Sequence, residues 1–164
     1  MPRILVACIG NIFLGDDAFG VEMAKRLVER RLPEGVSVID FGIRSYDLAY
    51  ALMQEWDLAI LVDALPREGE PGTLYTLQVE MPPTGGNPIS IDAHTMNPYS
   101  VMELVRALGG KLDRVFVIGC EPETIEPNPD GSIGLSPPVN AALDMAVQMV
   151  EELISRACSS SAAA

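Results

Sequence analysis

The stretch that decides the fold is Ile4-Leu-Val-Ala-Cys-Ile9, an unbroken apolar run near the start of the chain. Its length and continuity are typical of a strand that is buried on both faces of a sheet. Glycines at positions 10, 15 and 20 follow the run and indicate a loop. An amphipathic pattern then extends to Arg31 and predicts a helix. Its expected apolar face consists of Val21, Ala24, Leu27 and Val28.

The same alternation of strand and helix signals continues along the chain. Further apolar strands are expected at 36–39, 58–62 and 114–119, and helices at 47–53, from Asn97-Pro98 and from Ser136-Pro137. Residues 73–80 alternate between apolar and polar side chains, which predicts a half-buried strand at a sheet edge. Because strands and helices alternate, we expect an α/β fold with a mostly parallel sheet and helices on both faces.

The 164 residues include 23 acidic and 11 basic side chains, a formal net charge of −12. This balance excludes binding to nucleic acid or to an anionic membrane surface, since both need Lys and Arg. It is compatible with a bound cation or with a basic partner segment. The length predicts a single domain over residues 1–157, with residues 158–164 as a disordered, low-complexity tail.

The number and spacing of the cysteines indicate the cellular compartment of the protein. Cys8, Cys120 and Cys158 are odd in number and widely spaced, which is typical of a reduced, intracellular protein. No signal-peptide layout precedes the first strand, and no apolar stretch approaches the roughly 20 residues that cross a bilayer. The sequence therefore predicts a cytoplasmic protein without membrane insertion.

Acidic residues follow each of the first three predicted strands. Asp16 and Asp17 follow the first, Asp40 ends the second and Asp63 ends the third. In an open parallel sheet, ligands bind beyond the carboxyl ends of the strands, where the strand order reverses. The single histidine, His94, lies in a later loop.

Carboxylates and an imidazole are suitable ligands for a divalent metal ion, and three of them leave a coordination position open. We therefore interpret Asp17, Asp63 and His94 as candidate metal ligands. Asp16 or Asp40 would orient one of these ligands without binding the metal itself.

Other interpretations of these residues stay open. Residues 10–15 have the glycine spacing of a P-loop, but acids stand where Lys and Ser or Thr should follow, which disfavours a phosphate site. Asp16 or Asp17 alternatively caps the next helix. Cys120 and His94 form a candidate nucleophile and base without further support in the sequence.

The segment Ile9-Gly-Asn-Ile-Phe-Leu-Gly-Asp-Asp-Ala-Phe-Gly-Val21 resembles the opening of the hydrogenase maturation proteases. These are endopeptidases that trim the C-terminus of the large-subunit precursor of nickel-iron hydrogenases. The resemblance continues at Leu61-Val-Asp-Ala64, His94, Gly119-Cys-Glu-Pro-Glu123 and Gly134-Leu-Ser-Pro137. It therefore covers nearly the whole chain.

This resemblance implies a three-layer, phosphorylase/hydrolase-like α/β sandwich that acts as a monomer on the hydrogenase large-subunit precursor. It also implies that Asp17, Asp63 and His94 bind metal and take part in cleavage. In the family, cleavage is tied to nickel already inserted in the substrate. The implied metal is thus nickel supplied by the precursor, with zinc or cadmium as alternatives in the isolated protein. Either the metal or a carboxylate activates the attacking water.

Two positions depart from the family pattern. Ala18 stands where a glycine commonly follows the acidic pair, and Phe41 separates Asp40 from Gly42, which leaves the role of Asp40 open. Two further hypotheses also remain. One is a non-catalytic, nickel-binding chaperone of hydrogenase assembly, which would leave the mass of the precursor unchanged. The other is a small-molecule hydrolase or phosphorylase, which would be active without a protein substrate.

Overall fold

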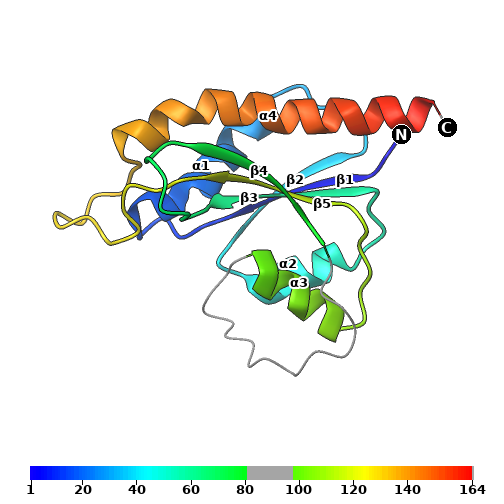
Figure 1. Cartoon of the computed structure of the whole chain (residues 1–164), viewed down its shortest axis with the longest axis horizontal. Coiled ribbons are helices and arrows are strands. Elements are labelled where there is room, and N and C mark those ends of the chain that lie inside the picture. Colours follow the sequence, from blue (N-terminus) through cyan, green and yellow to red (C-terminus); the bar gives the residue numbers. More distant parts are fainter. Residues whose placement is uncertain (81–97, 164) are drawn as a thin grey trace.

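The computed structural model describes residues 1–80 and 98–163. In chain order, its elements are β1 (Ile4–Ile9), η1 (Gly15–Ala18), α1 (Phe19–Val28), β2 (Val36–Gly42), α2 (Ser45–Leu52), β3 (Leu58–Ala64), β4 (Leu74–Val79), α3 (Pro98–Ala107), β5 (Val115–Cys120) and α4 (Pro137–Ala162). The strands form one sheet in the order β2-β1-β3-β5-β4 (Figure 1). All neighbouring strands pair in parallel except β4, which runs antiparallel to β5. β4 lies at the edge of the sheet, as the alternating pattern of residues 73–80 predicted.

Helices cover both faces of this sheet (Figure 1). Successive side chains of a strand point to opposite faces, so Ile4, Val6 and Cys8 pack with α1 and α4, whereas Leu5, Ala7 and Ile9 pack with α2 and α3. Every residue of β1 and β3 is buried. Each fully buried Ile, Leu or Val side chain contributes about 1.5–3 kcal/mol to stability. The expected three-layer α/β sandwich is confirmed.

The strand order reverses between β1 and β3, because β2 lies on one side of β1 and β3 lies on the other. This reversal creates a crevice at the carboxyl ends of these two strands. The start of α1 packs directly onto it. A Cβ atom on Gly20 would lie 2.0 Å from the Ile9 carbonyl oxygen and 2.7 Å from that of Val62. Glycine at position 20 is therefore required for the helix to lie so close to both strand ends.

Some expected boundaries differ from the structure. A short 3-10 turn, η1, precedes α1, and α1 ends at Val28 instead of reaching Arg31. Val28 is 64% exposed, so it does not belong to the buried face of the helix. β2 continues past Asp40 to Gly42, and its pairing register with β1 shifts at this point.

Part of the expected disordered tail is helical. Residues 158–162 continue α4, which ends at Ala162. The tail contains only Cys, Ser and Ala, and Ala has the highest helix propensity, so an established helix can propagate into it. Among the described residues, no helix is both long and apolar enough to cross a membrane.

Candidate active site

Asp17 and Asp63 meet at the carboxyl ends of β1 and β3. Asp63 belongs to β3 and is only 4% exposed, while Asp17 lies in η1 and is half-buried. Burial raises the pKa of Asp63 well above its usual range, and the negative charge of Asp17 raises it further. A main-chain hydrogen bond from Ala64 partly offsets this shift. The charge of Asp17 thus acts on Asp63, and their joint use as metal ligands stays a prediction.

The loop after β1 fixes the position of Asp17. The main-chain N–H of Asn11 donates to Asp17 Oδ2 at 3.1 Å. A Cβ atom on Gly10 would lie 2.1 Å from the Asp17 carbonyl oxygen, so glycine at this position allows the backbone to pass close to the acid. Burial raises the pKa of Asp17, and the Asn11 hydrogen bond partly lowers it again.

Two close carboxyl groups with raised pKa values have a restricted set of chemical uses. Each can hold a proton more readily than an exposed carboxyl group, because its pKa is raised. They can also place oxygen ligands on a cation, whose positive charge would stabilise both ionised forms. Perturbed acids in a crevice are typical of a functional site, and either use fits this pair.

The third predicted ligand, His94, lies outside the described residues. Within residues 1–80 and 98–163, no group of three or more His, Cys, Asp or Glu side chains is arranged to hold a metal ion. Asp17 and Asp63 therefore form a pair in the described part of the chain, and the three-ligand site stays a prediction.

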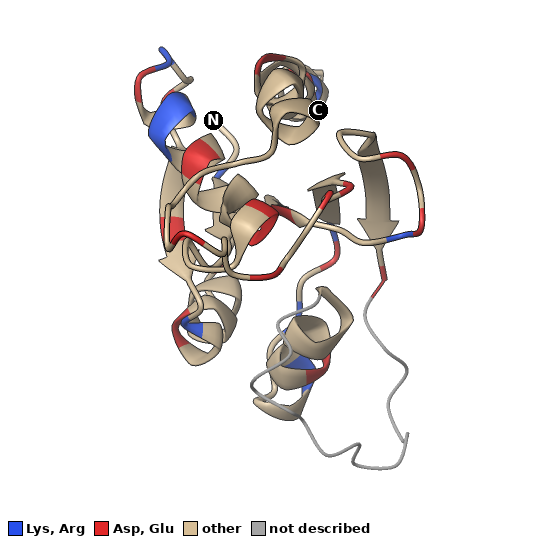
Figure 2. Cartoon of the chain, turned by 90° about the vertical axis from the view of Figure 1, so that its left-hand side faces the viewer, with Lys and Arg blue, Asp and Glu red and all other residues tan. Residues whose placement is uncertain are grey.

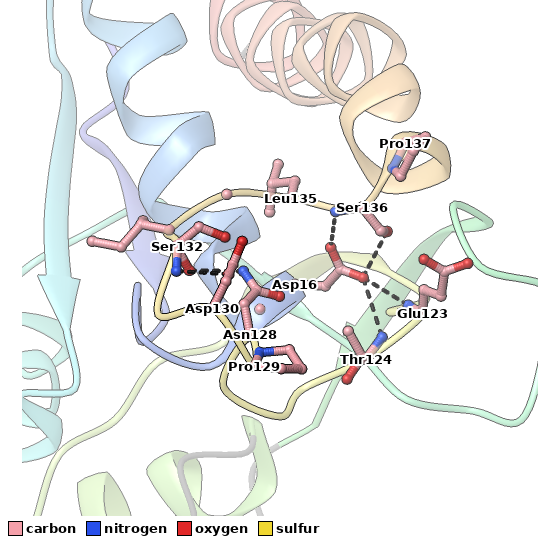
Figure 3. Close-up of a pocket in the computed structure, with 13 residues that line it drawn as sticks. Asp16, Glu123, Thr124, Asn128, Pro129, Asp130, Ser132, Leu135, Ser136 and Pro137 are labelled. Atoms are coloured by element: carbon pink, nitrogen blue, oxygen red, sulfur yellow. Dashed lines mark hydrogen bonds between the residues drawn. The ribbon is translucent and has the colours of Figure 1, made fainter.

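Asp16 is fully buried, and both of its carboxylate oxygens are used (Figure 3). Oδ1 accepts a hydrogen bond from Ser136 N at 2.7 Å. Oδ2 accepts from Ser136 Oγ at 2.8 Å, Glu123 N at 2.8 Å and Thr124 N at 3.3 Å. Asp16 N in turn donates to the Thr124 carbonyl at 2.9 Å. Asp16 thus ties η1 to both ends of the loop between β5 and α4.

The helix-capping interpretation of the acidic pair is not what the structure contains. Ala18 is the N-cap of α1, and no side chain caps that helix. Ser136 is the N-cap of α4, as the Ser136-Pro137 pair predicted, but its hydroxyl donates to Asp16 instead of accepting from its own helix. Asp16 precedes Asp17 in the chain and holds the loop between β5 and α4 in place.

Glu121 is a further buried carboxylate at this edge, besides Asp16 and Asp63, and sequence reasoning did not single it out. It is 4% exposed, and its Oε2 accepts from Arg67 N at 2.8 Å and from the Tyr75 hydroxyl at 2.9 Å. The Arg67 guanidinium lies over the Tyr75 ring at 5.5 Å. Glu121 thereby fixes the loop between β3 and β4. Its place in the Gly119–Glu123 segment of the family resemblance was the available signal.

Asp40 and Cys120 are two further residues that the sequence offered as candidates. Asp40 is exposed and its Oδ1 accepts a hydrogen bond from Gly42 N at 2.9 Å, so it stabilises the local turn. Its predicted orienting role stays a prediction. Cys120 is fully buried. Burial and the charges of Asp16 and Glu121 raise its pKa to about 12, so the thiol stays protonated at neutral pH and makes a poor nucleophile.

Comparison with known proteins agrees with this geometry. Residues 21–153 match the family model described as hydrogenase maturation protease. The chain belongs to the hydrogenase maturation protease family. The match includes Asp63 and position 94 but begins after Asp17, whose assignment depends on the opening motif and on its position beside Asp63.

Individual relatives are similar along most of their length. Hydrogenase 2 maturation protease from Escherichia coli is 34% identical over 151 residues, which cover 90% of this chain and 88% of the relative. A hydrogenase delta subunit from Methanothermobacter thermautotrophicus is 37% identical over 153 residues, covering 90% and 92%. The structure of the hydrogenase maturating endopeptidase HybD from E. coli superposes with a TM-score of 0.74 at 28% identity, covering 94% of this chain and 93% of HybD.

Proposed function

We propose that this protein is an endopeptidase that removes a C-terminal extension from the nickel-loaded large-subunit precursor of a hydrogenase. The observation that carries the proposal is the pairing of the half-buried Asp17 with the buried Asp63 at the strand-order reversal of a hydrogenase maturation protease fold. We expect the protein to act as a cytoplasmic monomer.

In the proposed reaction, nickel arrives as part of the substrate. Asp17 and Asp63, together with His94, bind it and so bring the adjacent peptide bond to the crevice. Attack by water on the carbonyl carbon breaks the C–N bond, and the water proton passes to a carboxylate and then to the leaving amine. The raised pKa values of Asp17 and Asp63 mean that nickel must displace any proton that the pair holds, and the positive charge of the metal would then stabilise both ionised forms.

Intact-mass analysis tests the proposal. The purified protein is incubated with nickel-loaded precursor and, in parallel, with nickel-free precursor. We expect the nickel-loaded precursor to lose a C-terminal peptide and the nickel-free precursor to keep its mass. Equal cleavage of both forms would contradict the role of nickel, and an unchanged mass for both would contradict the protease assignment.

A second candidate is a non-catalytic partner of hydrogenase assembly. It is favoured by the similarity to a protein named as a hydrogenase subunit. The same experiment separates the two, since a non-catalytic partner forms a stable complex with the precursor but leaves its mass unchanged.

A further inference from the structure

An open groove of about 630 Å³ lies between η1 and the loop that joins β5 to α4. Its lining includes Asp16, Glu123, Asn128, Asp130, Ile133 and Leu135 (Figure 3). The volume falls within the range of ordinary ligand pockets, about 300–1,000 Å³. Asp16 lines the groove, and Asp17 follows it in η1 without lining the groove, so the groove and the carboxylate pair are adjacent along the chain.

The charge of the groove has one sign. The sequence contains no Lys, Arg or His between Arg114 and Arg156. The loop itself carries three exposed acids, Glu123, Glu126 and Asp130. Figure 2 looks onto this edge of the sheet and shows acidic positions along several of its loops. A ligand in the groove would therefore encounter a negative potential without a nearby positive side chain on the loop.

Apolar side chains accompany these acids. Ile125 and Ile133, on the same loop, are 46% and 57% exposed, and Phe13 on the loop after β1 is 66% exposed. Large exposed hydrophobic side chains beside a groove are typical of a surface that binds another protein. A small ion or metabolite would leave them uncovered, whereas an extended polypeptide would cover them.

The groove is held in shape before any ligand binds. Asp16 ties both ends of the loop to η1. At the tip, Asn128 Nδ2 donates to the Ser132 carbonyl at 2.8 Å, and Ser132 N donates to Asp130 Oδ1 at 3.0 Å. A preformed site avoids the entropy loss of ordering a loop on binding.

We propose that this groove binds an extended segment of the substrate chain in which basic side chains alternate with apolar ones. The inference rests on the proposed function, since the segment belongs to the large-subunit precursor. The basic side chains face Glu123 and Asp130 in the groove and the exposed Glu126 on the same loop, and the apolar ones cover Ile133 in the groove and the exposed Ile125 on that loop. The groove thus contributes to recognition of the polypeptide, separately from recognition of nickel by the carboxylate pair.

The test neutralises the groove with the triple variant E123Q/E126Q/D130N. We expect the KM for nickel-loaded precursor to rise about tenfold, with kcat unchanged, because these charges bind the chain and do not touch the reacting bond. The dissociation constant of the precursor should rise by a similar factor, and the rise should shrink at high salt. Replacing Lys and Arg of the C-terminal segment of the precursor by Gln should reproduce the effect on the unmodified protein.

A matched control neutralises three acids at the amino-terminal ends of the parallel strands, at the opposite end of the strands from the groove. Glu34, Glu55 and Asp113 are exposed and precede β2, β3 and β5. The triple variant E34Q/E55Q/D113N should retain the unmodified KM and dissociation constant. Equal effects of the two triple variants would overturn the proposal, as would an unchanged dissociation constant in the groove variant.

The binding measurement also separates this inference from the proposed function. If no form of the protein cleaves the precursor, the protease assignment fails, while selective weakening of precursor binding in the groove variant still supports the docking site. If cleavage occurs and the groove variant behaves like the unmodified protein, the docking site fails alone.

Discussion

Asp16 and Asp17 are neighbours in the chain, yet their carboxylates have opposite surroundings. Asp16 is fully buried and accepts four hydrogen bonds from the loop between β5 and α4. Asp17 is half-buried, accepts a hydrogen bond from Asn11 N and faces the charge of Asp63. Within residues 1–80 and 98–163, both oxygens of Asp16 accept hydrogen bonds, whereas Asp17 accepts a hydrogen bond from Asn11 N at one oxygen.

The difference shows that burial of a carboxylate does not by itself identify a functional residue. A buried carboxylate that accepts several hydrogen bonds holds the surrounding structure together. A buried carboxylate with few donors and a like charge beside it is unstable when ionised, and such groups are typical of functional sites. Asp63 belongs with Asp17 in this second class, and Glu121 belongs with Asp16.

The largest effect on stability is expected for Asp16→Asn. Donors reach both oxygens of Asp16, so an amide NH₂ group must oppose at least one main-chain N–H whichever way it turns. We expect a loss of about 3 kcal/mol, because hydrogen bonds to a charged group are lost and buried donors become unsatisfied. Urea denaturation measures it. An unchanged unfolding free energy would show that Asp16 does not anchor the loop.

An opposite sign is expected for Asp63→Asn. The raised pKa means that the folded protein favours the protonated form of Asp63 more than the unfolded chain does. The contribution of Asp63 to stability is therefore complete below its usual pKa and is lost as the pH rises through the raised pKa. The neutral variant should be more stable by about 1 kcal/mol at pH 8, a size common for stabilising substitutions. Denaturation from pH 5 to 8 should show the gain growing with pH; a pH-independent loss would contradict the argument.

The smallest effect is expected for Glu121→Gln. Both donors to Glu121, Arg67 N and the Tyr75 hydroxyl, use the same oxygen, Oε2. The carbonyl oxygen of glutamine can accept both, so only the charge is lost. We expect destabilisation of about 0.5 kcal/mol by urea denaturation. A loss of unfolding free energy as large as that of Asp16→Asn would contradict this comparison. It would show that the number of carboxylate oxygens that accept hydrogen bonds does not determine the loss.

Local pattern was sufficient to predict the strands and the edge at which the site lies. Continuous apolar runs identified β1 and β3, and the order of elements placed Asp17 and Asp63 at neighbouring strand ends. The alternation of residues 73–80 correctly predicted an edge strand. These features depend on short-range periodicity and on general rules for parallel sheets.

Contacts between distant segments were not predictable in this way. The donors to Asp16 lie 107 to 120 residues further along the chain, and the donors to Glu121 lie 46 and 54 residues away. Neither separation leaves a local pattern. The exposure of Val28 was not predicted either. The amphipathic pattern placed the end of the helix at Arg31, whereas α1 ends at Val28.

The most direct test of the account is the cleavage of nickel-loaded precursor by the Asp17→Asn variant, followed by intact mass. Asparagine keeps the size of the side chain and removes its charge and its capacity to accept a proton. The account predicts that the variant folds and leaves the mass of the precursor unchanged over a time in which the unmodified protein completes the cleavage. Cleavage at the unmodified rate would contradict the assignment of Asp17 to the reaction.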